Sequence, residues 1–477
     1  MRKIFNWVIA ATLICGASVL ISCTDKSDNP VEPEKPIVNA DRQAFEKEFS
    51  IALQKSAEQI RFDAIKQALV SIGTFFETID EDALGEQVKN MLPNILASTT
   101  PVIAGDLNEE DFKAVCAALN DRFDMSEEDV REINGLLMVD AYNTIGTKKV
   151  TFKDGKATQS ENDGFCIENI DKDGKSSSIT LKFRDERDGV RFFVARLANI
   201  APICIQFPQQ IDITVSTANG VELSGTVFLS TSASSRYISF KNSQWAAACS
   251  LTADYEGRNE TLEALINHDQ DRSFDIGVNF GIDGVEKAAL TILGMNKPYS
   301  HEYIHSDELK SLRDCGPFFS AAYDVLKAIN GSTVDEIEFT LGRRLVCTAK
   351  VDDVAACLLA LGNIRKLHGT QPGFEAVDKY TQILNDNFHN TVGIKDTNIK
   401  AQGSLATVMK NFNEKEYQPA VALQFTGETK PMVLMDRMSE QDMANYKMMI
   451  GTVEEMSKYV SEMLKNLKEK FSGIKLI

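Results

Sequence analysis

The middle of the chain carries the feature that most constrains the fold, which is a series of alternating apolar and polar segments separated by tight-turn pairs. Residues 178–183, 210–216 and 221–229 alternate in this way. The turn pairs are Asp154-Gly155, Asp173-Gly174, Asn219-Gly220 and Asp283-Gly284. Such pairs reach positive φ at little cost and close β-hairpins. Successive hairpins without crossover helices predict a meandering antiparallel sheet over residues 136–295, and they exclude a doubly wound nucleotide-binding fold there.

Helical periodicity lies on both sides of this region. Apolar residues from Phe45 to Ile72 recur at three- and four-residue steps, which predicts one helix of about seven turns. The later part of the chain is predicted to contain helices at 352–367 and 374–388, strands near 404–410, 419–425 and 431–435, and a long terminal helix from Ser439 to Phe471. The segment His268-Asp269-Gln270-Asp271 has ligand-type residues without a supporting spacing and is predicted to be a loop.

The predicted fold class is therefore α+β. We expect an N-terminal helical unit at 41–133, a central antiparallel β-sheet domain at 134–300, and a C-terminal α+β unit at 301–477 that ends in the long helix. A chain of 477 residues exceeds what one compact core normally holds, so two or three units are expected.

The first residues have the pattern of an export signal. Arg2 and Lys3 precede an uncharged run, Ile4–Leu20, that is shorter than the roughly 20 apolar residues of a membrane span. The Leu-Ile-Ser-Cys stretch that ends at Cys23 resembles a bacterial lipobox. This resemblance implies a cleaved signal peptide at 1–22 and fatty acyl chains such as palmitate on Cys23. An ordinary secretory signal is the alternative.

Residues 23–40 are predicted to be a flexible, Pro-rich tether between the acylated cysteine and the folded body. Charged residues keep this segment solvated, and three prolines prevent regular structure: Pro30, Pro33 and Pro36. Asp25 and Asp28, close behind the anchor, favour export to the cell surface, and the periplasmic face is the alternative.

The β-rich region carries a family resemblance. In order, it contains Phe207-Pro208, Ile211-Asp-Ile-Thr-Val, Asn219-Gly-Val-Glu-Leu, Trp245 and Ser250-Leu-Thr-Ala. With the lipobox signal, this order resembles uncharacterised large lipoproteins of Bacteroides-like bacteria. The resemblance implies a lipid-anchored cell-envelope protein, with the outer membrane as the expected site. It carries over no activity and no site residues.

The net charge of the chain limits the classes of partner that it can bind. The formal net charge of −18 becomes −20 once a signal containing Arg2 and Lys3 is removed. Such an acidic surface repels phosphate backbones and anionic lipids, so we expect no nucleic-acid partner. We expect membrane attachment only through the acyl anchor on Cys23.

Of nine cysteines, those beyond Cys15 and Cys23 mostly have apolar neighbours. They are predicted to be buried thiols rather than a disulfide framework.

The sharpest catalytic motif is His301-Glu302-Tyr303-Ile304-His305. On a helix, this spacing places two histidines one turn apart on zinc, with Glu302 as the general base. Pro298 and the helix-start pattern at Ser306 instead predict a loop, in which His301 and His305 are solvated. A third ligand would have to be an acid such as Glu336 or Glu338, and both of these lie in a predicted strand.

No nucleophile elbow, P-loop or dinucleotide fingerprint is present in the sequence. The favoured hypothesis is therefore a lipid-anchored envelope protein with a non-catalytic binding or structural role and no cofactor. The alternative is a zinc-dependent peptidase that uses His301, Glu302 and His305. The predicted partner is a hydrophobic ligand or another envelope protein. An apolar-lined cavity would favour the ligand, and an exposed apolar patch would favour the protein.

Overall fold

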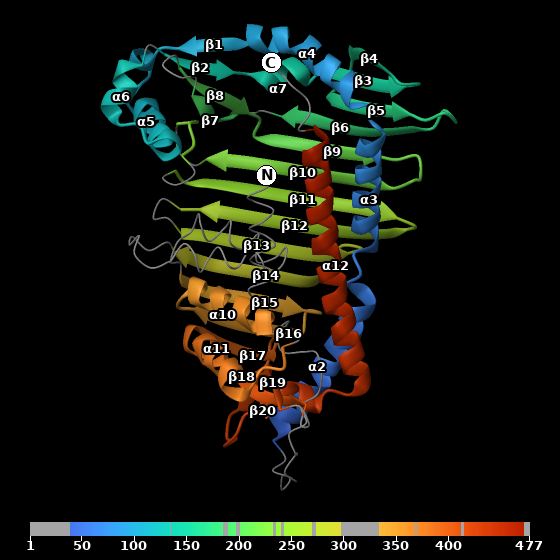
Figure 1. Cartoon of the computed structure of the whole chain (residues 1–477), viewed down its shortest axis with the longest axis vertical. Helices are drawn as coiled ribbons and strands as arrows, with labels where there is room; N and C mark the ends of the chain where they lie inside the picture. Colours follow the sequence, from blue (N-terminus) through green and yellow to red (C-terminus); the bar gives the residue numbers. More distant parts are fainter. Residues whose placement is uncertain are drawn as a thin grey trace. The chain divides into compact units, whose positions relative to one another are not determined.

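The computed structural model describes residues 39–133, 135–184, 189–196, 201–231, 235–239, 243–269, 273–296, 333–367, 370–411 and 415–471. The chain forms two compact units. Unit 1 comprises Met1–Phe62 and Ser273–Ser461, and unit 2 comprises Asp63–Arg272 and Glu462–Ile477. The predicted α+β class is confirmed, because N-terminal helices, a large antiparallel-rich sheet and a long C-terminal helix are all present (Figure 1).

Unit 2 contains the larger part of the predicted β region. Its main sheet has the strand order β12-β11-β10-β9-β6-β5-β3-β4, and every neighbouring pair is antiparallel except β3 and β5. The strands are β3 (Lys148–Lys153), β4 (Lys156–Glu161), β5 (Phe165–Ile170), β6 (Ser176–Arg184), β9 (Gln210–Ser216), β10 (Glu222–Thr231), β11 (Trp245–Tyr255) and β12 (Arg258–His268). The helices α3 (Asp63–Thr78) and α4 (Glu81–Ala97) contact this sheet, and α3 runs across β10, β11 and β12 (Figure 1).

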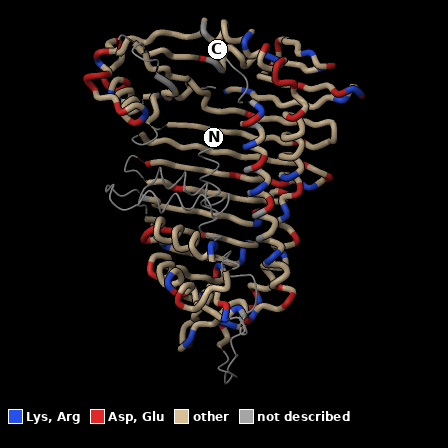
Figure 2. The backbone as a smooth tube through the Cα atoms, viewed as in Figure 1, with Lys and Arg blue, Asp and Glu red and all other residues tan. Residues whose placement is uncertain are grey.

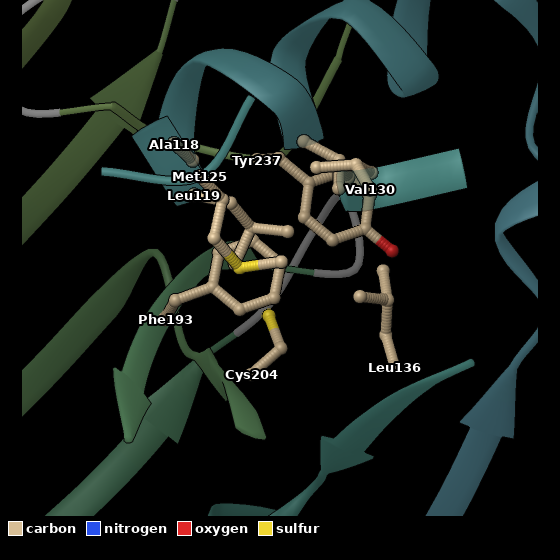
Figure 3. Packing of buried hydrophobic residues seen from close by; sticks show 9 residues of the cluster. Ala118, Leu119, Met125, Val130, Leu136, Phe193, Cys204 and Tyr237 are labelled. Atoms are coloured by element: carbon tan, nitrogen blue, oxygen red, sulfur yellow. The ribbon is translucent and has the colours of Figure 1, made fainter. Parts of the chain in front are cut away.

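A second, four-stranded sheet in unit 2 has the order β1-β2-β8-β7, in which β2 and β8 are parallel. Its strands are β1 (Thr99–Val102), β2 (Leu136–Val139), β7 (Val190–Arg196) and β8 (Pro202–Phe207). Three helices accompany them: α5 (Glu109–Phe123), α6 (Glu127–Glu132) and α7 (Ala141–Ile145). Figure 3 shows the core that these elements share, where Phe193 and Tyr237 stack near Leu119, Met125 and Cys204.

Unit 1 contains a sheet with the strand order β20-β19-β18-β17-β16-β15-β14-β13, in which every neighbouring pair is antiparallel. The strands are β13 (Ser273–Ile282), β14 (Val285–Asn296), β15 (Thr333–Leu341), β16 (Leu345–Val351), β17 (Phe388–Ile394), β18 (Lys400–Asn411), β19 (Glu416–Phe425) and β20 (Met432–Val433). Its helices are α2 (Ala40–Gln59), α10 (Val354–Leu367), α11 (Phe374–Asn387) and the first turns of α12 (Glu440–Phe471). The predicted C-terminal helices and strands are thus confirmed.

The helix predicted from Phe45 to Ile72 is wrong as a single element. It is divided into α2 and α3, because residues 60–62 leave the helix and Phe62 has a φ of 53°. The Phe62 ring packs on Phe280, with the ring centroids 4.5 Å apart. Tertiary packing therefore overrides the apolar periodicity at this point.

The predicted turn pairs all lie in hairpin turns. At Asp154-Gly155 the φ values are 50° and 74°, and at Asp283-Gly284 they are 50° and 72°. Two consecutive positive φ values identify type I′ turns, whose twist matches that of paired strands. Two consecutive positive φ values also occur at Glu256-Gly257, in a turn that links β11 to β12 and that the sequence analysis did not predict.

Candidate functional site

The residues predicted to carry lipid or metal lie outside the described part of the chain. These are Cys23, His301, Glu302 and His305, and they stay predictions. The proposed third ligands are described: Glu338 in β15 pairs with Thr291 and Thr348, and Glu336 pairs with Leu293. Among the described residues, no three His, Cys, Asp or Glu side chains form a group that could hold a metal ion. Within the same ranges, no helix is both long and apolar enough to cross a bilayer.

His268 is not a loop residue, as the sequence predicted, but the last residue of β12. It is 2% exposed and stacks on Trp245, with the ring centroids 5.5 Å apart. Its Nδ1 lies 2.7 Å from the carbonyl oxygen of Ser243. Trp245 is itself buried, so this ring is not available as a platform for a sugar.

An apolar cavity lies in unit 1 between two helices and three strands. It has a volume of about 20 Å³. Its lining comes from α10, α11 and β16–β18: Val351, Val354, Cys357, Leu358, Leu361, Leu384, Phe388 and Leu405. Ligand pockets usually measure roughly 300–1,000 Å³. This cavity is therefore a small packing defect and does not hold a ligand the size of a lipid chain.

The main sheet of unit 2 has one face covered by helices. Glu260, which is fully buried, accepts hydrogen bonds from the backbone N–H groups of Asp63, Ala64 and Ile65 at 3.0–3.1 Å. These are the first residues of α3, so Glu260 points toward the helix-covered face. Side chains alternate between faces along a strand. Residues at odd offsets from Glu260 in β12, among them Leu265, therefore point to the opposite face.

We call that opposite side of β6, β9, β10, β11 and β12 the open face. One row of cross-strand neighbours on it consists of Arg184, Gln210, Phe228, Ala248 and Leu265. Phe228 is 39% exposed and Leu265 is 41% exposed, and only Ala248 stands between them. Two large apolar side chains, on β10 and β12, are thus presented to solvent with an alanine of β11 between them.

The adjoining rows of the open face are polar. The next row is Lys182, Asp212, Thr226, Ser250 and Glu263, and the row after it is Thr180, Thr214, Ser224, Thr252 and Thr261. The strands of Figure 2 accordingly carry few charged residues along their middle parts, and charges of both signs gather mainly at strand ends and on helices. The apolar row is therefore bordered by small hydroxyl side chains and a few charges.

Asp212 shows that charges inside this face are already compensated. It accepts from Arg184 Nε at 2.6 Å, from Gln210 Nε2 at 2.7 Å and from Thr226 Oγ1 at 3.2 Å. Partial burial acts to raise the pKa of Asp212, but these three donors outweigh it and hold the pKa below its ordinary value. The carboxylate stabilises the sheet and is a poor candidate for acid–base chemistry.

An exposed apolar patch with a polar border is the usual composition of a protein-docking surface. The open face is therefore the candidate binding surface among the described residues. No protein-family model matches the chain, and neither the curated proteins nor the solved structures provide a match.

The sequence analysis did not single out Phe228 or Leu265. Both belong to alternating segments, which indicate that a strand has two faces but not which face is covered. Only the placement of α3 on the side of Glu260 shows that Phe228 and Leu265 lie on the face opposite α3.

Proposed function

We propose that the chain is a lipid-anchored cell-envelope protein without catalytic activity, which binds another envelope protein through the open face of unit 2. The observation that carries this proposal is the exposed pair Phe228 and Leu265 on a sheet face that is otherwise polar.

The binding part of the proposal is tested by site-specific photo-crosslinking. A photoreactive residue at 228 or 265 should give a crosslinked product in intact cells, because the partner lies within a few ångströms of these positions. The matched control is position 285, since Val285 is 40% exposed but lies in unit 1. Equal crosslinking at 228, 265 and 285, or none at 228 and 265, would contradict the proposal.

The anchoring part of the proposal is tested at Cys23. A Cys23→Ala variant lacks the thiol that would be acylated. It should therefore not be labelled with a fatty-acid analogue. A control variant, Cys116→Ala, should be labelled like the wild type. Undiminished acyl labelling of Cys23→Ala would show that Cys23 is not the anchor.

The peptidase alternative makes a different prediction. If His301 and His305 bind zinc, the purified protein should contain zinc in stoichiometric amount and lose it in a His301→Ala variant. That result would replace the binding proposal with a catalytic one.

A further inference from the structure

We propose that unit 2 holds a second binding site, in which the guanidinium of Arg191 and the hydroxyl of Tyr237 bind the carboxylate of a small organic acid. The site contains neither Phe228 nor Leu265, so this inference goes beyond the proposed docking role and does not depend on it. The observation that carries it is the half-buried guanidinium of Arg191, which has no acidic partner among the described residues.

Both the backbone and the side chain of Arg191 are held in place. In β7, its N–H donates to the carbonyl oxygen of Arg236, and its own carbonyl accepts from the N–H of Ile238, each at 2.8 Å. Its Nε donates to Gln206 Oε1 at 3.1 Å, and the guanidinium lies over the Tyr237 ring, 5.3 Å from the centroid. The guanidinium is therefore oriented before any ligand binds, which lowers the entropic cost of binding.

The acceptor of the Arg191 side chain is neutral. Gln206 is 8% exposed, and its Nε2 lies 3.4 Å from the hydroxyl of Tyr142. An amide oxygen satisfies one N–H donor but brings no negative charge. Arg258 of the same unit provides the contrast, because its Nε donates to the fully buried carboxylate of Glu260 at 2.7 Å. Arg258 thus has a counter-ion, and Arg191 has none.

The ionisable groups beside Arg191 do not compensate its charge. Burial raises the pKa of Cys204 to about 12 and also raises the pKa of Tyr237, in both cases against the opposing effect of Arg191. Both side chains are therefore uncharged at neutral pH. The carboxylate of Asp111 is the smallest of the causes that act on the pKa of Tyr237, and its Oδ2 accepts from Asn108 Nδ2 at 2.8 Å. It forms no ion pair with Arg191.

Hydrogen-bond donors of Arg191 and Tyr237 remain available beside each other. A guanidinium has five N–H donors, of which one is taken by Gln206 and another by the Tyr237 oxygen. The Tyr237 hydroxyl keeps its own hydrogen, and in Figure 3 it points away from Phe193. The side-chain atoms of the described chain that are buried without a partner include none of Arg191 or Tyr237. The remaining donors of these two residues are therefore open to solvent.

The charge and shape of these donors favour a carboxylate. The planar fork of a guanidinium matches the two oxygens of a carboxylate, which it binds through two parallel hydrogen bonds. A single carboxylate neutralises the one positive charge of Arg191. A phosphate dianion would instead add a surplus negative charge to a chain whose net charge is already −18.

The test follows the arginine Nε–H signals by NMR in the full chain, purified in detergent, while acetate replaces chloride at constant ionic strength. The Arg191 signal is assigned by its absence from Arg191→Lys or Arg191→Gln, and it should shift until the site is saturated. The Arg258 signal is the internal control and should not move, because Glu260 already binds its guanidinium. Tyr237→Phe should weaken acetate binding about tenfold, since it removes one donor to a charged group.

The proposal would be overturned by an Arg191 signal that does not shift, by equal shifts of Arg191 and Arg258, or by unchanged acetate affinity in Tyr237→Phe. Inorganic phosphate is titrated in the same way, and tighter binding of phosphate than of acetate would overturn the carboxylate as the ligand class. Unfolding curves show whether Tyr237→Phe is folded. The comparison of Arg191 with Arg258 uses the unmodified chain, so it decides the proposal even if this variant is destabilised.

Discussion

A single buried carboxylate fixes the start of α3. Glu260 Oε1 and Oε2 accept three backbone N–H groups at the helix N-terminus, and Arg258 Nε donates to Oε1 at 2.7 Å. A carboxylate at this position satisfies donors that the first helical turn cannot pair internally, and it also interacts favourably with the helix dipole. This residue explains why a helix restarts at Asp63 directly after the break at Phe62.

Glu260→Ala should therefore lower the free energy of unfolding by about 3 kcal/mol, because it removes the carboxylate that accepts from three backbone N–H groups of α3 and from Arg258. Glu260→Gln should cost less, since its carbonyl oxygen still accepts from the helix. Urea unfolding measures both values. The matched control is Glu222→Ala, an exposed carboxylate in β10 of the same sheet, which should change stability by less than about 0.5 kcal/mol. Equal losses for the variants at 260 and 222 would contradict this role.

Buried thiols provide a second prediction at the scale of residues. Desolvation raises the pKa of both Cys204 and Cys357 to about 12, and their exposed fractions are 1% and 3%. At pH 8 both thiols are therefore protonated and shielded, and the thiolate is the reactive form. Alkylation followed by mass mapping should label these two residues only after the protein is unfolded. Labelling of either residue in the native protein at a rate near that of a free thiol would be inconsistent with this packing.

At the scale of elements, α11 closes an exposed strand edge. Strand β17 pairs with β18 from Lys400 to Gly403. Two residues beyond Gly403, the Asn385 side chain hydrogen-bonds to the backbone of β18. Its Nδ2 donates to Leu405 O at 2.8 Å, and its Oδ1 accepts from Leu405 N at 2.7 Å. The amide thus replaces a neighbouring strand and keeps the edge from pairing with another chain.

Asn385→Leu should cost about 2 kcal/mol of unfolding free energy, because both backbone groups of Leu405 lose their partner. Gln382→Leu, on an exposed position of the same helix, is the control and should have little effect. Chemical denaturation of the two variants gives the comparison. A loss for Asn385→Leu no greater than that of the control would show that the edge is closed in another way.

Elements with strong local signals could be predicted from the sequence, and those that depend on distant residues could not. The turns at Asp154-Gly155 and Asp283-Gly284 follow from residues that tolerate positive φ. The break at Phe62 could not be predicted, because its causes, Phe280 and Glu260, lie about 200 residues away in sequence. The turn at Glu256-Gly257 was missed because glutamate is not a typical residue for a left-handed conformation.

At the scale of the whole molecule, the two compact units differ from the segments predicted along the sequence. The boundaries expected at residues 133 and 300 follow changes in periodicity, whereas the units end at residues 62, 272 and 461 because contacts join distant parts of the chain. Helix α12 begins in unit 1, and in unit 2 Lys470 Nζ near its end donates to the carbonyl oxygens of Phe76 and Glu77 at 2.8 Å. The candidate site could not be predicted either, since exposure of Phe228 depends on which face α3 covers.

The most direct test of the central claim is hydroxyl-radical footprinting of the chain in intact membranes, with labelling at each residue normalised to the unfolded chain. Phe228, Leu265 and Val285 are all about 40% exposed in the isolated chain. If the open face binds a partner protein, Phe228 and Leu265 should be several-fold less labelled than Val285, since protein interfaces exclude water from their apolar centre. Equal normalised labelling at the three residues would contradict the account.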